Sequence, residues 1–141
     1  SGLALVAEQL EALGICIRYR PLQSDVYVMA DEHSLAQVVV NLLDNARDAV
    51  LAHHSEGATI SLQERADEHF FALTVEDNGG GIDKAAIDHI FEPFFTTKKI
   101  GTATGLGLAI SYGAMSALGG DIRATNTPEG ARFTVRIPVS P

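Results

Sequence analysis

The sequence predicts a two-layer α/β sandwich of the α+β type, with a mixed, mainly antiparallel sheet and helices on one face. Three observations lead to this fold class. Helix-like and strand-like hydrophobic patterns alternate along the chain, short polar turns that suit antiparallel hairpins join strand patterns, and no regular series of crossovers occurs. The 141 residues favour one domain, and 46% hydrophobic with 20% charged residues is typical of a folded chain.

The chain is expected to begin with a short helix and two short strands. Apolar residues at spacings of three and four form one helix face, and Gly14 ends that helix. This face consists of Leu3, Val6, Leu10 and Leu13. Alternation over 15–19, closed by Pro21, predicts the first strand, and the run 26–29 predicts the second.

A long helix follows, and it is the strongest helical signal in the chain. Asp31 is well placed as its N-cap, and an apolar face continues for about five turns. That face consists of Leu35, Val38, Val39, Leu42, Leu43, Ala46, Ala49 and Val50. The pattern predicts a helix that packs on the sheet.

A hairpin and a short helix are expected next. Two strand patterns, 59–64 and 69–76, flank the polar turn 65–68, which by length and composition suits an antiparallel hairpin. Asp83 can cap a short helix that continues through Ile90.

The last third of the chain is expected to contain a loop, a helix and two strands. The segment 91–104 has no clean period, which predicts a mobile loop. A helix over 105–118, stopped by Gly119, and two strands at 121–126 and 131–139 complete the fold.

The charge and the single cysteine exclude several classes of function. The chain has 10 Lys and Arg residues and 18 Asp and Glu residues, and this net charge of −8 disfavours binding to nucleic acid or to anionic lipid. The lone Cys16 cannot form an internal disulfide or a cysteine-based zinc site. No apolar run reaches the roughly 18 residues of a membrane span, and no signal peptide is evident. We therefore expect a cytoplasmic domain without direct membrane contact.

Two asparagines on the long helix are the first candidate site residues. Asn41 and Asn45 lie four residues apart, so their carboxamides and that of Gln37 share one helix face. A carboxamide oxygen is a hard donor that suits an octahedral Mg²⁺ ion retaining most of its waters. The alternative is that these side chains are only the solvated polar face of the helix.

A carboxylate followed by glycines is the second candidate. Asp77 ends a strand, and Gly79, Gly80 and Gly81 follow, then Ile82. Glycine allows positive φ cheaply and lets a flat ring approach the backbone, and a buried carboxylate beside such a gap can accept from an exocyclic amine. The alternative is a tight turn with a helix cap.

A glycine-rich helix start is the third candidate. In the stretch from Gly101 to Leu108, Gly105 and Gly107 open a helix whose free amides and dipole favour an anion such as phosphate. This signal is weak alone, because neither a GxxxxGK[ST] P-loop nor a GxGxxG motif occurs.

Four blocks taken together carry a more specific signal. In order they are Asn41 to Asn45, Asp77-x-Gly79-x-Gly81, Phe91-Glu-Pro-Phe-Phe95 and Gly105-Leu-Gly107-Leu108. They resemble the N box, first glycine box, F box and second glycine box of sensor histidine kinases, and the resemblance to their catalytic domain covers roughly residues 30 to 138. It implies the Bergerat ATP-binding fold, shared with type II topoisomerases, heat-shock chaperone ATPases and mismatch-repair ATPases.

The resemblance implies a role for each block, with ATP and Mg²⁺ as cofactors. Asp77 would hold the adenine amine, Asn41 would ligate Mg²⁺, and Asn45 would lie beside the phosphates. The backbone from Gly105 to Leu108 would cradle the phosphates, and 82–104 would form a lid. The residues expected to contact ATP are Asn45, Asp77, Gly79, Gly81, Ile82, Thr97, Lys98, Gly105, Leu106, Gly107 and Leu108. Catalysis would rest on Asn41 and Asn45.

Asn41 also separates kinase from ATPase. The resemblance implies that hydrolysing relatives carry a glutamate there, which activates water, whereas an amide has no usable basicity near neutral pH. We therefore expect transfer of the γ-phosphoryl group to a histidine of the protein's own dimerisation domain, which in turn feeds the receiver domain of a response regulator. A homodimer is expected for the full-length protein, whose anchoring in a membrane stays open, and a monomer for this chain alone.

The acceptor histidine is expected outside this chain. The family's acceptor is usually followed by an acidic residue, and none of the five histidines here fits. We expect residues 1–13 to combine the remnant of a cleaved expression tag with the link to a missing dimerisation domain, and 14–141 to form the catalytic domain. A metal site at the adjacent His53 and His54 is disfavoured, because they point in different directions on a helix end.

Two positions depart from the family pattern. Asp48 stands where many members carry a basic residue that meets phosphate, so either Arg47 or the lid cations Lys98 and Lys99 compensate, or Asp48 points away. Ala131 stands where a threonine often follows the glycine of the last strands, which puts one water-mediated base contact in doubt.

Two other functions therefore stay open beside the kinase. One is a degenerate docking module without ATP turnover, and the other is a stand-alone ATPase, which Asn41 disfavours. Phe91, Phe94 and Phe95 are interpreted as hydrophobic anchors of the lid rather than as groups that stack on the base.

Overall fold

A computed structural model describes residues 2–22, 32–53, 56–92 and 107–139. The helices and strands, in chain order, are α1 (Gly2–Ala12), β1 (Cys16–Arg20), α2 (Glu32–His53), β2 (Thr59–Ala66), β3 (Phe70–Asp77), α3 (Gly107–Ala117), β4 (Asp121–Asn126) and β5 (Ala131–Pro138). The expected strand 26–29, the cap Asp31 and most of the expected loop 91–104 lie outside the described residues.

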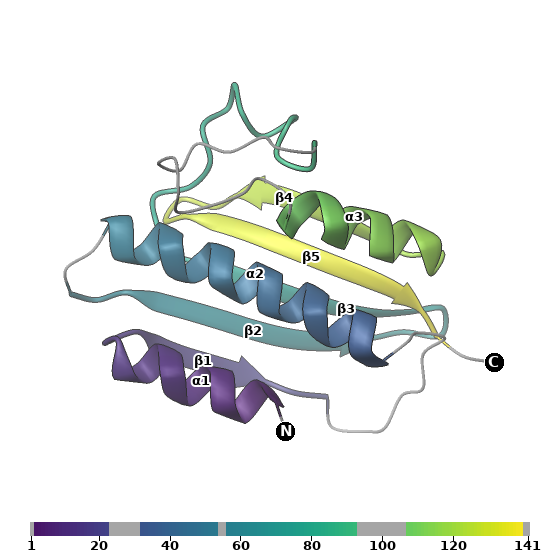
Figure 1. The fold of residues 1–141 in the computed structure, drawn as a ribbon, viewed down its shortest axis with the longest axis horizontal. Coiled ribbons are helices and arrows are strands. Elements are labelled where there is room, and N and C mark those ends of the chain that lie inside the picture. Colours follow the sequence, from purple (N-terminus) through teal and green to yellow (C-terminus); the bar gives the residue numbers. More distant parts are fainter. Residues whose placement is uncertain (1, 23–31, 54–55, 93–106, 140–141) are drawn as a thin grey trace.

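The described strands form one mixed sheet with helices on one face, as the sequence predicts. The strand order is β1-β2-β3-β5-β4, with β1 parallel to β2 and every other neighbouring pair antiparallel. The three described helices lie in front of this sheet, with α2 across its centre and α3 beside β4 and β5 (Figure 1). The two-layer sandwich is therefore confirmed. None of the described helices is long and apolar enough to cross a membrane.

The core lies between α2 and the sheet. Leu42, Leu43 and Val50 of the predicted apolar face are at most 1% exposed, and they meet the alternate buried residues of β2, β3 and β5. Those sheet residues include Ile60, Leu62, Val75, Phe133 and Val135. Ala46, a small buried residue on the same face, lets the helix lie close to the strands. This packing fixes α2 on the sheet and so fixes what its remaining face meets.

The first helix forms as expected, but its apolar stripe is shorter. Leu10 is 4% exposed and belongs to the core, whereas Leu13 is 53% exposed. Helix α1 ends at Ala12, and Gly14 with φ of 86° turns the chain, so Leu13 leaves the stripe. The expectation that Leu13 shares this face with Leu10 is wrong.

The hairpin of β2 and β3 is confirmed, with longer pairing than expected. Strand β2 continues to Ala66, and the turn is closed by Asp67, whose Oδ1 accepts the N–H groups of His69 and Phe70 at 2.8 Å each. The register pairs Ile60, near the start of β2, with Asp77, the last residue of β3. Asp77 therefore lies at the end of the hairpin opposite its turn.

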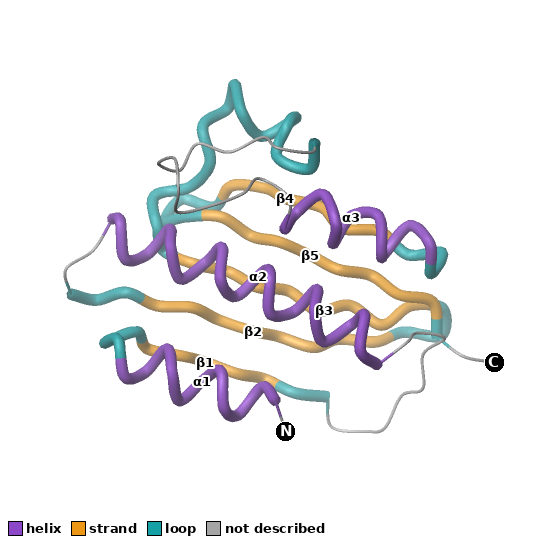
Figure 2. Tube along the Cα trace, in the orientation of Figure 1, coloured by secondary structure: helices purple, strands orange, loops and turns teal. Residues whose placement is uncertain are grey.

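The short helix expected over 83–90 is not a helix. Asp83 acts as a cap, because its Oδ1 accepts the N–H of Ala85 at 3.0 Å. Only the bond from Ile87 N–H to Asp83 C=O spans four residues, however, and the others described in this segment span three. The segment is a series of turns that projects beyond the β4 edge of the sheet (Figure 2).

Candidate functional site

One face of helix α2 connects the predicted site residues. Asn41, Asn45, Ala49 and His53 recur every fourth residue and so lie in one row along the helix. The row meets the start of α3 at Asn41 and the glycine turn after β3 at Ala49 and His53. From Asn41 to Ala49 the helix rises about 12 Å. A single helix thus positions both ends of the candidate site, the end at Asn41 and the end at the glycine turn.

Asn41 fastens α2 to the first turn of α3. Its Nδ2 donates to Gly107 C=O and to Ser111 Oγ, both at 3.2 Å, and its Oδ1 accepts from Gln37 Nε2 at 3.1 Å. Ser111 is fully buried, and its hydroxyl donates to Gly107 C=O at 2.9 Å. Asn41 and Gln37 are therefore more than a solvated polar face, since Asn41 orients the start of a neighbouring helix.

Asn45 lies one turn further along the same row. Its side chain is half-buried, and it makes no hydrogen bond with any other described residue. On α3, Gly107 forms the N-terminus, and Leu108 is partly buried against the core. The first-turn N–H groups of a helix have no partner within the helix, and the positive end of the α3 dipole lies at this end, which Asn41 contacts.

Asp77 forms the other end of the site. It is 6% exposed, and its Oδ1 accepts the N–H groups of Gly79 at 2.9 Å and Ala131 at 3.4 Å. Its Oδ2 has no donor among the described residues, yet none of their side-chain oxygens is both buried and unpaired. One carboxylate oxygen is therefore anchored to the protein, and the other retains exposure and can accept a further hydrogen bond.

Burial raises the pKa of the Asp77 carboxyl group above its ordinary value. The hydrogen bonds from Gly79 and Ala131 act in the opposite direction, because they favour the charged form, but burial is the larger effect. A half-satisfied carboxylate at a strand end is typical of a group that meets a polar ligand rather than of a core residue.

The glycines after Asp77 are required by close packing within the protein. A Cβ on Gly79 would lie 2.7 Å from the backbone carbon of Ala49, and one on Gly130 would lie 2.0 Å from Asp77 C=O. Gly81, with φ of 87°, approaches Asn126 and Gly130. At Gly79 the missing side chain makes room for helix α2, because Ala49 fills the Cβ direction. Whether Gly79, Gly81 and Ile82 line a base stays a prediction.

Asn126, the last residue of β4, was missed by sequence reasoning. Its Oδ1 accepts the N–H of Ile82 at 2.8 Å, and its Nδ2 donates to the Ile82 C=O at 2.8 Å. This two-bond clamp holds the glycine turn against the turn between β4 and β5, 44 residues away in sequence. The signal available in the sequence is an asparagine at a strand end before the turn Thr-Pro-Glu-Gly.

Arg47 and Asp48 form an ion pair on the exposed side of α2. Arg47 donates to Asp48 Oδ1 at 3.2 Å and to Asp44 Oδ1 at 3.3 Å. Of the alternatives raised by Asp48, the described residues therefore show it paired with Arg47. The cations Lys98 and Lys99 lie outside the described residues.

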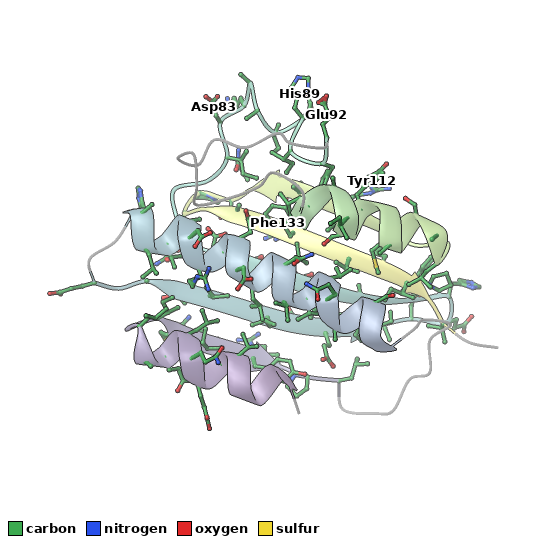
Figure 3. All side chains as sticks on the ribbon, viewed as in Figure 1. Asp83, His89, Glu92, Tyr112 and Phe133 are labelled. Atoms are coloured by element: carbon green, nitrogen blue, oxygen red, sulfur yellow. The ribbon has the colours of Figure 1, made fainter. Side chains whose placement is uncertain are left out.

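The turn segment after Ile82 is fastened by an aromatic cluster. The Phe91 ring lies 5.4 Å from that of Tyr112 and meets Phe133 edge-on at 6.3 Å. Phe133 lies on the sheet, Tyr112 on α3, and Asp83, His89 and Glu92 on the projecting segment (Figure 3). Phe91 is thus a hydrophobic anchor, as expected. The corresponding expectations for Phe94, Phe95, Thr97, Lys98, Gly105 and Leu106 lie outside the described residues.

Comparison with known proteins agrees with this architecture. The profile of the family described as "Histidine kinase-, DNA gyrase B-, and HSP90-like ATPase" matches residues 30–141. The catalytic domain of histidine kinase ThkA is 30% identical, with a TM-score of 0.84 over 98% of this chain and 89% of that one. Full-length ShkA in complex with AMPPNP is 28% identical, with a TM-score of 0.80 over 97% of this chain and 28% of that one.

Longer sensor proteins contain similar sequences. The two-component sensor PprA of Pseudomonas aeruginosa is 39% identical over 99% of this chain and 15% of its own length. Sporulation kinase A of Bacillus subtilis is 35% identical over 96% of this chain and 22% of its own length. The chain thus spans about a fifth, or less, of these relatives.

The fold and the site together define a histidine kinase-type catalytic domain of the kind found in sensor kinases. The chain belongs to the histidine kinase-, DNA gyrase B- and HSP90-like ATPase family.

Proposed function

We propose that this chain binds Mg-ATP and transfers the γ-phosphoryl group to a histidine on a dimerisation domain outside it, within a homodimeric two-component sensor kinase. A receiver domain of a response regulator is then the next acceptor. Residues 14–141 form the catalytic domain in this proposal, and 1–13 connect it to the dimerisation domain. The observation that carries the proposal is Asp77, a buried strand-end carboxylate with one oxygen fastened by backbone and the other able to accept.

Asp77 is the residue that binds the base in this proposal. A neutral amine donor such as the adenine 6-amino group complements the available oxygen, whereas a carbonyl at that position would meet like charge. Because Gly79 and Ala131 hold the first oxygen, the carboxylate is oriented before any ligand arrives. The clamp between Asn126 and Ile82 fixes the adjoining backbone in the same way.

The phosphate end rests on α2 and the start of α3. Asn41 meets the N-terminus of α3, Asn45 lies one turn further along the same row of α2, and the dipole of α3 favours anions at this end. Among the described residues the Asn41 Oδ1 accepts one hydrogen bond, from Gln37, and a carbonyl oxygen has a second lone pair for a hard cation. No group of three or more His, Cys, Asp or Glu side chains able to hold a metal occurs in the described part of the chain. Asn41 therefore fits a Mg²⁺ ion whose other ligands are phosphate and water, and which would neutralise phosphate charge.

Asn41 supports transfer to a partner rather than to water. Its amide nitrogen is committed to Gly107 and Ser111, and an amide cannot take a proton from water near neutral pH. The residues of this chain thus bind and orient the nucleotide, and the nucleophile comes from elsewhere.

The exposed apolar side chains of α3 support an approach of the acceptor from that side. Ile110 is 57% and Tyr112 is 47% exposed, and both lie within two turns of the helix start that would face the phosphates. Large exposed apolar groups beside a reaction site are typical of a docking contact.

One observation favours the alternative of a docking module without turnover. Arg47, the cation nearest to Asn45 in sequence, is paired with Asp44 and Asp48. It therefore offers the phosphates less positive charge than an unpaired arginine would.

The test joins the chain to a dimerisation domain that carries an acceptor histidine and supplies γ-labelled ATP with Mg²⁺. We expect acid-labile label on that histidine and little free phosphate, with both signals lost in Asp77→Ala. A variant that lacks the acceptor histidine is the control and should bind nucleotide without retaining label. If the control releases phosphate as fast as the protein that carries the acceptor histidine, the ATPase is favoured. If neither protein binds nucleotide, the docking module is favoured.

A further inference from the structure

The face of the sheet opposite the helices carries most of the positive charge of the protein. Side chains alternate between the two faces along a strand, and the positions between the core residues point away from the helices. Six arginines occupy such positions, out of 10 Lys and Arg residues in the whole chain. They are Arg18 and Arg20 on β1, Arg65 on β2, Arg123 on β4, and Arg132 and Arg136 on β5. We call this surface the open face.

The strand register arranges these arginines in three rows across the open face. The first row runs Arg18, Ser61, Glu76, Arg132 and Thr125. The second row runs Arg20, Gln63, Thr74, Thr134 and Arg123. The third row runs Arg65, Ala72, Arg136 and Asp121. Each row holds two arginines, and small or uncharged polar residues occupy most of the centre.

The arginines on the β4 and β5 side are already paired with carboxylates of the same face. Arg136 donates to both oxygens of Asp121, at 2.7 and 3.3 Å, and Arg132 pairs with Glu76. The Nη2 of Arg123 also lies 3.8 Å from the Oδ2 of Asp121. The pair of Arg136 with Asp121 uses the planar fork of arginine, which matches the two oxygens of a carboxylate.

The arginines on the β1 and β2 side are available for a partner. Arg18, Arg20 and Arg65 are exposed, and none pairs with a carboxylate among the described residues. The one hydrogen bond that Arg65 donates within the described part of the chain goes from Nη2 to Oε1 of the neutral Gln63, at 3.4 Å. Arg18 and Arg20 lie two residues apart on one strand, hence about 7 Å apart, and Arg65 continues the series beyond Gln63 on the next strand.

The charge of the open face is opposite to that of the rest of the molecule. The strand positions that face outward on it carry six arginines and the two carboxylates Glu76 and Asp121, a formal charge of +4, while the strand carboxylates Glu64 and Asp77 alternate onto the helix side. The whole chain carries −8, so the remainder carries −12. An extended polyanion such as nucleic acid or a bilayer would meet this larger negative field, whereas a short acidic segment lying on the face would meet mainly the local positive one.

We propose that the open face is a docking surface for a carboxylate-rich protein segment, bound by Arg18, Arg20 and Arg65. The arginines at the β4 and β5 ends of the same rows already bind carboxylates on this surface, and all six basic residues are arginine rather than lysine. A second copy of this chain fits less well, because joining the open face of one copy to the acidic side of the next is a head-to-tail contact that does not close. This proposal does not depend on nucleotide binding.

The test titrates the isotope-labelled chain with a short oligoglutamate peptide and follows backbone amide shifts at a physiological ionic strength of about 0.15 M. We expect shifts on β1 and β2 and none on α2 or α3. The triple variant Arg18→Gln, Arg20→Gln, Arg65→Gln should bind at least about tenfold more weakly. Replacing the same three residues by Lys keeps the charge, removes the fork, and should give an intermediate affinity.

A control variant separates local from total charge. Gln9→Glu, Ser116→Glu and Ala117→Glu lower the net charge by the same amount at exposed sites on the helices, and should change peptide affinity by less than about twofold. Equal weakening in both triple variants, or shifts confined to the helices, would overturn the proposal. So would tighter binding of duplex DNA or phosphatidylglycerol vesicles than of the peptide, or a dimer that the triple arginine variant abolishes.

Discussion

Replacing Asp77 with asparagine changes one atom at the base end of the site and leaves its anchoring in place. The amide oxygen can still accept the N–H groups of Gly79 and Ala131, as Oδ1 does now. The second oxygen, which has no donor among the described residues, becomes an NH₂ group. The position that meets the ligand therefore changes from hydrogen-bond acceptor to donor.

The expected loss follows from the charge of the missing contact. A hydrogen bond to a charged group contributes about 1.5 to 3 kcal/mol, and each 1.4 kcal/mol corresponds to about tenfold in affinity. Asp77→Asn should thus weaken binding of an adenine nucleotide by about 10- to 150-fold. A guanine nucleotide carries a carbonyl where adenine carries its amine, so its binding should weaken less or improve.

Calorimetric titration of wild type and Asp77→Asn with non-hydrolysable ATP and GTP analogues, in the presence of Mg²⁺, measures this change in preference. Glu76→Gln is a matched control, because it replaces a carboxylate by an amide at the preceding residue, whose side chain lies on the open face of the sheet. If adenine affinity is unchanged in a folded Asp77→Asn protein, or if both nucleotides weaken equally, Asp77 does not read the base.

The same substitution should also change the pH dependence of stability. Because burial raises the folded-state pKa of Asp77, ionising it costs folding free energy, and stability falls as pH rises from the unfolded-state value of 3.8 through the raised pKa. Asparagine does not ionise. The stability of Asp77→Asn relative to wild type, measured by urea unfolding, should therefore increase from acid to neutral pH, and a constant difference would contradict this reasoning.

Substitutions at four further positions test the packing around the site. Gly130→Ala should unfold or strongly destabilise the protein, because its Cβ would lie 2.0 Å from a backbone oxygen, whereas Gly113→Ala, with no atom within 4 Å, should stabilise helix α3 by about 0.5 to 1 kcal/mol in urea unfolding. Equal changes in the free energy of unfolding for Gly130→Ala and Gly113→Ala would refute the packing argument. Asn126→Ala should leave the Ile82 N–H and C=O without partners and weaken binding of an ATP analogue. Asn126→Asp should weaken it too, because it keeps the acceptor for the Ile82 N–H but places a second oxygen against the Ile82 C=O, and unchanged binding in both variants would mean that the clamp does not position the turn. Phe91→Ala should lower the free energy of unfolding by about 1 to 3 kcal/mol, and Phe91→Leu should lower it less. Equal losses in the two variants would mean that the ring contacts contribute nothing to stability.

The fold could be predicted from the sequence where one periodic pattern is long. The apolar face of α2 continues for five turns, and no other secondary structure buries those residues together. The hairpin was equally clear, because two alternating runs flank a polar turn. The turn segment after Asp83 was mistaken for a helix because its cap is present, while the anchoring of Phe91 on Tyr112 and Phe133 depends on elements far along the chain.

The candidate site was predictable as a set of motifs but not as a set of contacts. Nothing in the sequence shows that Asn41 donates to Gly107, 66 residues away, or that α2 fills the space beside Gly79. Asn126 was missed for the same reason, since its partner Ile82 lies on a different turn. The chemistry of a residue can be read locally, whereas the neighbour that it serves is set by tertiary packing.

The most direct test of the proposed function is a calorimetric titration of this chain with a non-hydrolysable ATP analogue and Mg²⁺, beside Asp77→Ala. We expect binding in the micromolar range that is lost in the variant and weakened when EDTA removes the metal. Absence of binding in both proteins, with the wild-type chain folded, would contradict a nucleotide site and favour the docking module.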